Sequence, residues 1–527
     1  MTENTDANRP GPFDYLTEAT DADVVRVPGG LTEQQQMIVE SARNFMNEGV
    51  IPRRGELEEG DPEVMREVMR EAADVGLTAV GIPERFGGVE LDLPTGMLVG
   101  SELARDLSFS LSLGAHIGIG TFPLVIFGDE ELKERYLPQL VTAERIGAYA
   151  LTEPGGGSDA LNPRTRAADR DGGGYRLNGR KQWITNAQIA GLYTVFANLD
   201  GEEFTAFLLP AEADGIEVGA PEDKMGRHGS PTGALMFDDA PVPAGHVVGG
   251  VGQGHRVALN TLNIARIKLG YGASGGIGEL LEISSNYASE RTQFGRPIGA
   301  FELIRSKITK MATQKFLLDG ICHHVVHCVD EELPDDLDGA DTGPICDVLK
   351  KHAVTSALIK VYGSEALADV ADEAVQIHGG YGYMEEYDVC RIYRDVRADR
   401  IFEGTNEVNR LLAARNIFKA GMAGEIALPE LMQLGQAAPP AASGTARELA
   451  DALRWVFARC IGAAADKLEG DFEENQDVAA GLVDLATELF VLDTAAARVE
   501  ARDRNSLEPD RARALLECAT EYVRGRT

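Results

Sequence analysis

The sequence contains little cysteine, little lysine and no surplus of positive charge. It has 6 Cys in 527 residues and no CxxC pair, which excludes a disulfide scaffold and favours a reducing compartment. Lys and Arg together number 50 against 84 Asp and Glu, giving a net charge of −34. Nucleic acids and anionic membranes bind basic surfaces, so we expect neither as a partner. Lys is scarcer than Arg, which would suit a salt-rich cytoplasm but leaves open whether the host is a halophile.

Targeting and membrane-spanning segments are also missing. The segment 1–30 is polar and acidic, without the cationic and apolar regions of a secretory signal. No apolar run approaches the ~20 residues that a bilayer crossing needs. We therefore expect a soluble, cytoplasmic protein. The length predicts about three or four structural units.

The order of helical and strand-like patterns divides the chain. Helical periodicity gives way near Tyr149 to short runs punctuated by Gly, Asp and Pro, and it returns near Val257. Runs of one element type, without alternation, argue against a doubly wound parallel sheet. We expect a flexible N-terminal segment (1–30), an N-terminal helical domain (31–148), a middle β domain (149–256), a C-terminal helical bundle domain (257–426), a linker (427–445) and a helical appendix (446–527).

Four short patterns match functional motifs without the context that those motifs need. GYGASG at residues 270–275 fits a dinucleotide-binding pattern, and the overlapping GASGG fits a nucleophile elbow, but the surrounding segment predicts one long helix packed through small residues. His323 and His327 lie one helical turn apart without a third ligand, and the acidic run from Asp330 lacks the ligand order of a calcium loop. We therefore expect no metal site.

Four longer segments are far more specific. They read YALTEPGGGSD (149–159), GRKQWITN (179–186), ERTQFGRPIG (290–299) and QIHGGYGYMEEYDVCRIYRDVRADRIFEGTNEVNRLLAAR (376–415). With them, residues 31–420 resemble the acyl-CoA dehydrogenase family, flavoenzymes that desaturate acyl-CoA thioesters between Cα and Cβ. The resemblance implies FAD as cofactor and a mainly α fold with a central β domain: an N-terminal helical domain, an antiparallel β-barrel-like middle domain and a C-terminal four-helix bundle. A C-terminal helical appendix follows here.

The resemblance assigns the flavin site to these segments. Thr152 would lie near the pyrimidine end of the flavin, Trp183 would cover one face, and Thr185 would donate a hydrogen bond at N5. The alternative for Trp183 is an aromatic residue of the sheet core. The implied cofactor-binding residues are Tyr149, Leu151, Thr152, Gly157, Ser158, Trp183, Ile184, Thr185, Arg291, Gln293, Phe294, Phe301, Gln376, Ile377, Gly379, Gly380, Thr405 and Glu407.

Part of this set is implied to act across a subunit interface. Arg291, Gln293 and Phe294 resemble the segment that holds the partner subunit's FAD, and an Arg suits a pyrophosphate because its planar fork donates two charge-assisted hydrogen bonds. Residues 376–380 resemble an adenosine-side contact of the same kind. The resemblance therefore implies a homodimer or homotetramer with a shared FAD site.

The catalytic base is implied to be Glu403. Removing a proton alpha to a thioester needs a buried carboxylate of raised pKa and donors for the developing enolate, and Ile401 and Phe402 give an apolar surrounding. Some relatives carry the base immediately before the Arg that is Arg266 here, but this chain has Ala265. The implied substrate-binding residues are Ser158, Asn263, Arg266, Gly404 and Arg415, with Asn263 standing where many relatives have Asp.

The C-terminal extension resembles the very-long-chain branch of the family. Gly114, Gly118 and Gly120 are interpreted either as room at the bottom of an acyl tunnel or as plain helix packing. In that branch the extension is linked to membranes, but residues 447–527 hold 11 basic and 17 acidic side chains, which leaves membrane association in doubt.

Three functions remain open from the sequence. The leading hypothesis is desaturation of long-chain acyl-CoA to trans-2-enoyl-CoA in fatty-acid β-oxidation, with an electron-transfer flavoprotein as acceptor. The alternatives are an acyl-CoA oxidase that uses oxygen and a non-catalytic assembly protein that keeps the fold. Residues 240–278 contain no Asp or Glu but include Arg266 and Lys268, which predicts a basic region inside an acidic shell.

Overall fold

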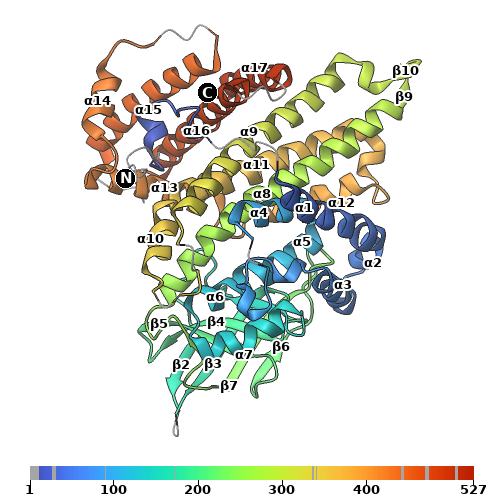
Figure 1. Ribbon diagram of the computed structural model, residues 1–527, viewed down its shortest axis with the longest axis vertical. Helices are drawn as coiled ribbons and strands as arrows, with labels where there is room; N and C mark the ends of the chain where they lie inside the picture. The colour runs from blue at the N-terminus through green and yellow to red at the C-terminus, as the bar shows by residue number, and fades with distance from the viewer. Residues whose placement is uncertain are drawn as a thin grey trace.

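Figure 1 shows the computed structural model of the chain, which describes residues 11–25, 31–89, 91–170, 173–334, 337–339, 341–440, 444–468, 474–504 and 509–527. Long helices run through the middle of the molecule, with a sheet at one end of them. Further helices, drawn in orange and red, lie at the other end. The expected mainly α fold with a central β domain is confirmed.

The N-terminal domain consists of short helices that begin at side chains able to cap them. Thr32 and Gln35 form a capping box, in which each side chain accepts a hydrogen bond from the other residue's N–H. Asp61, Asp92 and Asp129 cap three further helices. The elements are α1 (Glu33–Phe45), the π-helical η3 (Met46–Val50), α2 (Arg54–Glu58), α3 (Pro62–Asp74), α4 (Leu93–Leu103), α5 (Leu107–Gly114), the π-helical η7 (Ala115–Gly120), α6 (Phe122–Phe127) and α7 (Glu130–Val141).

The middle domain is built on one sheet. Its strands are β1 (Gly147–Ala150), β2 (Arg166–Asp169), β3 (Tyr175–Thr185), β4 (Leu192–Leu199), β5 (Glu203–Pro210), β6 (Ile216–Val218), β7 (Thr232–Val242) and β8 (Val247–Val248). The order is β6-β7-β3-β2-β4-β5-β8, with β1 beside β4. The sheet is mixed rather than antiparallel throughout, because β1 and β2 both pair parallel with β4. The apolar β4 and β5 are almost wholly buried and form the sheet core.

The central helices form the third unit. They are α8 (Gly254–Glu290), α9 (Glu302–Glu332), α10 (Gly343–Lys351), α11 (Ala353–His378), the 3-10 turn η9 (Gly379–Tyr383), α12 (Asp388–Asp395), the 3-10 turn η10 (Val396–Arg400) and α13 (Asn406–Ala423), with the hairpin β9 (Thr292–Gln293) and β10 (Arg296–Pro297) between α8 and α9. The GYGASG motif lies inside α8, where a Cβ on Gly270 would clash with Ile359 and one on Gly275 with the Ser101 carbonyl. These glycines serve helix packing, as expected.

The C-terminal unit begins earlier than expected. It contains α14 (Leu428–Gln436), α15 (Ala446–Leu468), α16 (Gln476–Arg504) and α17 (Pro509–Arg526). The prediction of a linker over 427–445 is wrong for 428–436, because this segment has a Pro in its first turn and buries Leu431, and its Gly435 admits the α15 backbone at Ala458. Residues 441–443 lie outside the described residues.

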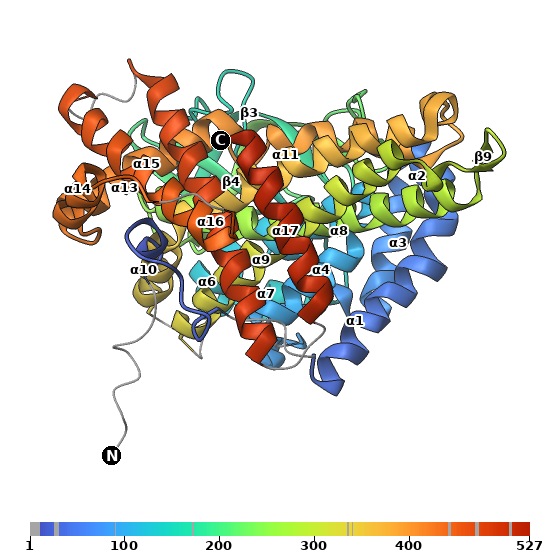
Figure 2. The same cartoon turned by 90° about the horizontal axis from the view of Figure 1, so that it is seen from above.

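The prediction of a flexible segment over 1–30 is wrong for residues 11–25. Tyr15 is buried, and its ring centroid lies 4.6 Å from that of Phe490 on α16. Arg454 on α15 donates to the Tyr15 carbonyl oxygen at 3.1 Å, and the Thr20 N–H donates to Asp493 at 2.7 Å. Residues 1–10 and 26–30 lie outside the described residues. Residues 11–25 are therefore packed against the C-terminal helices α15 and α16 (Figure 2).

One helical stretch, Leu107–Phe127, is long and apolar enough to cross a membrane by length and composition. The expectation that no apolar run approaches that length is therefore wrong. The stretch spans α5, η7 and α6, and 67% of its apolar window is buried inside the protein. Burial within the protein core explains the apolar composition without a bilayer.

Candidate active site

Glu403 lies in a tight turn between η10 and α13. Glu403 has φ 57° and Gly404 has φ 81°, so two consecutive residues adopt the left-handed conformation. The two carbonyl oxygens of this turn are held by buried side chains: Arg266 Nε donates to Glu403 O at 3.2 Å, and Lys360 Nζ donates to Gly404 O at 2.8 Å. Asn409 Nδ2 also donates to Gly404 O, at 2.7 Å. These contacts fix the turn that carries the Glu403 side chain.

The carboxylate of Glu403 is surrounded by positive charge but makes no hydrogen bond to any described residue. Burial raises the pKa of Glu403, and the charges of Arg266 and Lys360 oppose that rise. Burial likewise lowers the pKa of Arg266 to about 10 and that of Lys360 to about 8. The Glu403 N–H has no described acceptor either. The turn thus presents a base and a backbone donor that are both available to a ligand.

Asn263 takes part by orienting Arg266. Its Oδ1 accepts a hydrogen bond from Arg266 Nη1 at 2.8 Å, and its Nδ2 donates to Leu349 O at 3.1 Å. The amide therefore holds the guanidinium as an Asp would, but without neutralising it. Arg266 keeps its full charge beside Glu403.

Tyr149 on β1 faces the same turn. Its hydroxyl is buried without a hydrogen-bond partner among the described residues, and burial, followed by the negative charge of Glu403, raises its pKa. A buried hydroxyl without a partner usually marks a site that a ligand or water completes. Tyr149 therefore contributes an unpaired hydroxyl close to Glu403.

The loop that follows β1 is anchored by an ion pair that the sequence interpretation missed. Lys181 on β3, fully buried, donates to Glu153 at 2.7 Å and to Leu151 O at 3.1 Å. Glu153 also accepts from the Arg164 and Thr165 N–H groups. Both residues stand inside the quoted segments LTEPG and GRKQWIT, so their charges were visible, but their pairing across the sheet was not. Gly157 and Ser158 remain exposed at the loop tip.

Trp183 is not part of the sheet core. The β3–β7 register is irregular between Lys181 and Ile184, and Trp183 has φ 57° and is 59% exposed. Ile184 is buried, and Thr185 pairs with Thr232. An exposed Trp in a strained bulge is expected where a flat ligand covers the ring. The core alternative for Trp183 is therefore wrong.

Arg227 is a second residue that the sequence interpretation missed. It is buried at φ 55° between the middle domain and the helices, and its guanidinium lies 5.3 Å from the Phe402 ring. It donates to Asp395 O at 3.0 Å and Leu107 O at 3.1 Å and forms an ion pair with Asp399. Arg227 therefore fixes the segment that leads into Glu403.

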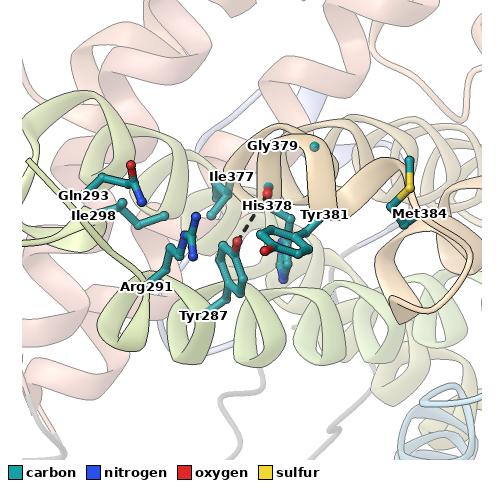
Figure 3. Close-up of a pocket in the computed structure, with 10 residues that line it drawn as sticks. Tyr287, Arg291, Gln293, Ile298, Ile377, His378, Gly379, Tyr381 and Met384 are labelled. Carbon is teal, nitrogen blue, oxygen red and sulfur yellow. Dashed lines mark hydrogen bonds between the residues drawn. The ribbon is translucent and has the colours of Figure 1, made fainter.

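A pocket of about 450 Å³ lies at the far end of α8 (Figure 3). Arg291 extends over the Tyr381 ring at 5.3 Å, and the Tyr287 hydroxyl donates to His378 O at 3.3 Å. Neither Gly379 nor Gly380 has an atom within 4 Å of where a Cβ would be, which leaves open space at the end of α11. The pocket is lined by Tyr287, Arg291, Gln293, Ile298, Ile377, His378, Gly379, Gly380, Tyr381 and Met384.

The structure therefore places the expected site residues in two groups. Arg266 and Arg291 are separated by 25 positions along α8, which corresponds to about 38 Å. The hairpin carrying Gln293 and Phe294 projects from the molecule (Figure 2), and Phe294 is 94% exposed while its ring contacts Phe301 at 6.0 Å. Of the other expected residues, Gln376, Glu407 and Arg415 are exposed, and Thr405 caps α13.

The donor set fits a flavin dinucleotide. Trp183 offers an exposed ring face, Tyr149 an unpaired hydroxyl, and the Arg291 pocket a guanidinium with glycine backbone open to a ligand. Among the residues that the structure describes, no cluster of His, Cys, Asp and Glu suits a metal ion.

Comparison with known proteins identifies relatives along most of the chain. Models of the acyl-CoA dehydrogenase N-terminal, middle and C-terminal domains match residues 32–144, 148–240 and 252–418. A probable acyl-CoA dehydrogenase of Bacillus subtilis is 37% identical, over 92% of this chain and 84% of its own. The very long-chain specific mitochondrial enzyme of Homo sapiens is 34% identical, over 76% of this chain and 60% of its own. The crystal structure of an acyl-CoA dehydrogenase with FAD from Bacillus anthracis has a TM-score of 0.92 at 34% identity, covering 98% of this chain and 90% of that one.

Proposed function

The chain belongs to the acyl-CoA dehydrogenase family with FAD as its cofactor, and from this premise we propose that it desaturates long-chain acyl-CoA to trans-2-enoyl-CoA in fatty-acid β-oxidation. We further propose an electron-transfer flavoprotein as the acceptor. The similarity to a very long-chain specific relative and the C-terminal helices α14–α17 support the long-chain preference.

The observation that carries the proposal is the Glu403 turn. Its side chain is partly buried, its carboxylate lacks a described hydrogen-bond donor, and it interacts electrostatically with Arg266 and the unpaired Tyr149 hydroxyl. Burial makes the carboxylate a stronger base, while Arg266 and Lys360 stabilise its ionised form. Glu403 would accept the Cα proton, and its N–H would donate to the thioester oxygen as negative charge develops there. Bound FAD supplies the acceptor for the hydride that leaves Cβ.

We also propose that the FAD site is shared between two copies of the chain. The Arg291 pocket and the Glu403 turn are about 38 Å apart along α8, more than the diameter of a small domain, so one cofactor cannot contact both within a single chain. The projecting hairpin with its exposed Phe294 supports pairing with a second copy, because an apolar side chain of that size is seldom left in water.

Anaerobic titration of the purified protein with a series of acyl-CoA chain lengths tests the reaction. Glu403→Gln should keep FAD bound but abolish its bleaching by substrate, whereas Glu425→Gln, at an exposed position after α13, should behave as wild type. Bleaching by the Glu403→Gln variant at a near wild-type rate would contradict the proposal. Stoichiometric hydrogen peroxide under air would instead indicate an oxidase, and bound FAD without turnover at any length would indicate an assembly protein.

Complementation tests the shared site. Glu403→Gln and Arg291→Ala subunits should each be inactive alone, but a mixed dimer contains one site with both defects and one with neither. Co-expression in equal amounts should therefore restore about a quarter of wild-type activity, since half of the dimers are mixed. Absence of any recovery in proven mixed dimers would show that both residues serve one site within the chain.

A further inference from the structure

Lys268 is a charged residue that the proposed chemistry does not use. It lies on α8, two positions beyond Arg266, within the stretch 240–278 that contains no Asp or Glu. No described residue forms a hydrogen bond or an ion pair with its amine. The side chain is directed toward η7, since its Nζ lies 3.5 Å from where a Cβ on Gly118 would be.

Two glycines near this amine adjoin open space. A Cβ on Gly114, one helical turn before Gly118, would meet no atom within 4 Å, and neither would one on Gly272, one turn after Lys268 on the same face of α8. Gly120 differs, because a Cβ there would clash with the backbone of Gly147. Of the three glycines considered as room for an acyl chain, Gly120 therefore serves packing, Gly114 leaves space, and Gly118 admits Lys268.

Lys268 is partly enclosed by protein. Its side chain is neither fully buried nor exposed, and burial lowers the pKa of its amine to about 8, with no neighbouring charge contributing to that shift. η7, toward which the amine is directed, also contacts β1, the strand that carries Tyr149. The amine therefore points toward an element that adjoins the proposed reaction site.

No acidic side chain among the described residues contributes to the pKa shift of this amine. α6 carries no titratable side chain. His116, whose pKa burial lowers to about 4, and His323, whose pKa burial lowers to about 3, are both neutral near pH 7. Several groups on the packed elements are engaged elsewhere: Glu102 (α4) with Arg43, His116 (η7) with Leu140 O and Gly147 N–H, Arg266 (α8) with Asn263 and Glu403 O, Asp319 (α9) with Ser274 and Lys315, His323 (α9) with Tyr271, and Lys360 (α11) with Gly404 O.

We propose that Lys268 is a specificity-determining residue whose ammonium group lines the acyl cavity and favours acyl thioesters that carry a carboxylate on the chain over plain chains of the same length. The inference rests on the proposed function and names its substrate class. An isolated ammonium in a cavity is poorly solvated. A carboxylate on the substrate replaces the lost hydration with an ion pair. A hydrocarbon chain offers no partner for the charge. It binds either after Lys268 has lost its proton or beside an unsolvated ammonium.

The two substrate classes should therefore respond oppositely to pH. Plain chains bind best when Lys268 is neutral, and carboxylate-bearing chains bind best when it is charged. The ratio of kcat/KM for the carboxylate-bearing substrate to that for the plain one should fall as the pH rises through about 8. Because the ratio compares two substrates of one enzyme, the titration of Glu403 cancels from it.

The test compares mono-CoA thioesters of dicarboxylic acids with straight-chain acyl-CoA of equal length, across a series of lengths. Lys268→Met keeps the length of the side chain. At the substrate length where the wild-type ratio is highest, it should lower the ratio at least about tenfold and make the ratio independent of pH. Lys268→Arg should retain the preference. Lys350→Met, at an exposed position on α10, is the matched control and should leave the ratio unchanged.

The outcomes separate the two proposals. If wild type turns over plain chains but no carboxylate-bearing chain, or if its ratio does not change with pH, the role of Lys268 is refuted while the proposed function stands. If wild type turns over neither class, the proposed function itself fails. The pH profile of wild type needs no substitution, so the inference is tested even where Lys268→Met does not fold.

Discussion

Replacing Arg227 should destabilise the protein and displace the catalytic turn. The substitution Arg227→Met removes the partner of Asp399, which is only 4% exposed, and two hydrogen bonds to the carbonyls of Asp395 and Leu107. Leaving a buried charge unpaired costs about 3–5 kcal/mol, and for a chain of this length the loss should lower the thermal midpoint by about 3–5 °C. Because Asp399 leads directly toward Glu403, kcat should fall as well.

The pH dependence of this destabilisation shows whether it comes from the unpaired charge of Asp399. Burial raises the pKa of Asp399, and the positive charge of Arg227 opposes that rise. Without Arg227 the folded-state pKa rises further above the unfolded value, so the protonated acid is favoured in the fold. The destabilisation by Arg227→Met should then be largest at high pH and shrink as the pH falls through the raised pKa.

Differential scanning calorimetry from pH 5 to 8 measures this destabilisation for Arg227→Met and for the double variant Arg227→Met with Asp399→Asn. The double variant should regain much of the stability that Arg227→Met loses. Arg176→Met is the control, since the Arg176–Asp239 pair is exposed and worth only about 0–1 kcal/mol. A loss no greater than that of the control, or an equal loss with Asp399→Asn present, would refute the reasoning.

Three other substitutions test separate parts of the structure. Lys181→Met leaves Glu153 buried without its cation and should cost about 3–5 kcal/mol in thermal or denaturant unfolding, while FAD affinity falls because the loop after β1 loosens. Trp183→Ala removes a side chain that is 59% exposed and held at positive φ, so the free energy of unfolding should change by less than about 1 kcal/mol while FAD fluorescence and retention change. Tyr15→Ala should cost about 3–5 kcal/mol and release residues 11–25 to proteolysis, because the Tyr15 ring is buried against Phe490.

The sequence pattern was sufficient to predict features that depend on residues close together in the chain. Small residues inside a helical pattern explain why α8 packs closely despite two enzyme-like motifs. The pairing of Lys181 with Glu153 and of Arg227 with Asp399 depends on the sheet register and on contacts between positions 172 apart in the chain. Neither has a spacing that local pattern can detect.

The same distinction explains the errors at the chain ends. Residues 11–25 and 428–436 are short and lack strong periodicity, and each is stable only because α15 or α16 covers its apolar side chains. Tertiary packing supplies most of the stability of such short segments, so composition alone suggests flexibility or a linker. Trp183 was left between two alternatives for a related reason: a strand pattern does not show a bulge, and the bulge exposes the ring.

A net charge of −34 is compatible with the binding of anionic ligands because Asp and Glu are absent from parts of the site. Two polyanions, FAD and a CoA thioester, must approach this chain, and long-range repulsion would oppose both. The Arg291 pocket has no Asp or Glu among its lining residues, and the first 25 residues of α8 include Arg266 and Lys268 but no acid. Adding a carboxylate there, for example Gly272→Asp in the open space facing Lys268, should neutralise this amine and abolish any preference for carboxylate-bearing chains while leaving FAD bound. An unchanged ratio of the two substrate classes in that variant would mean that the local charge of α8 does not govern selection.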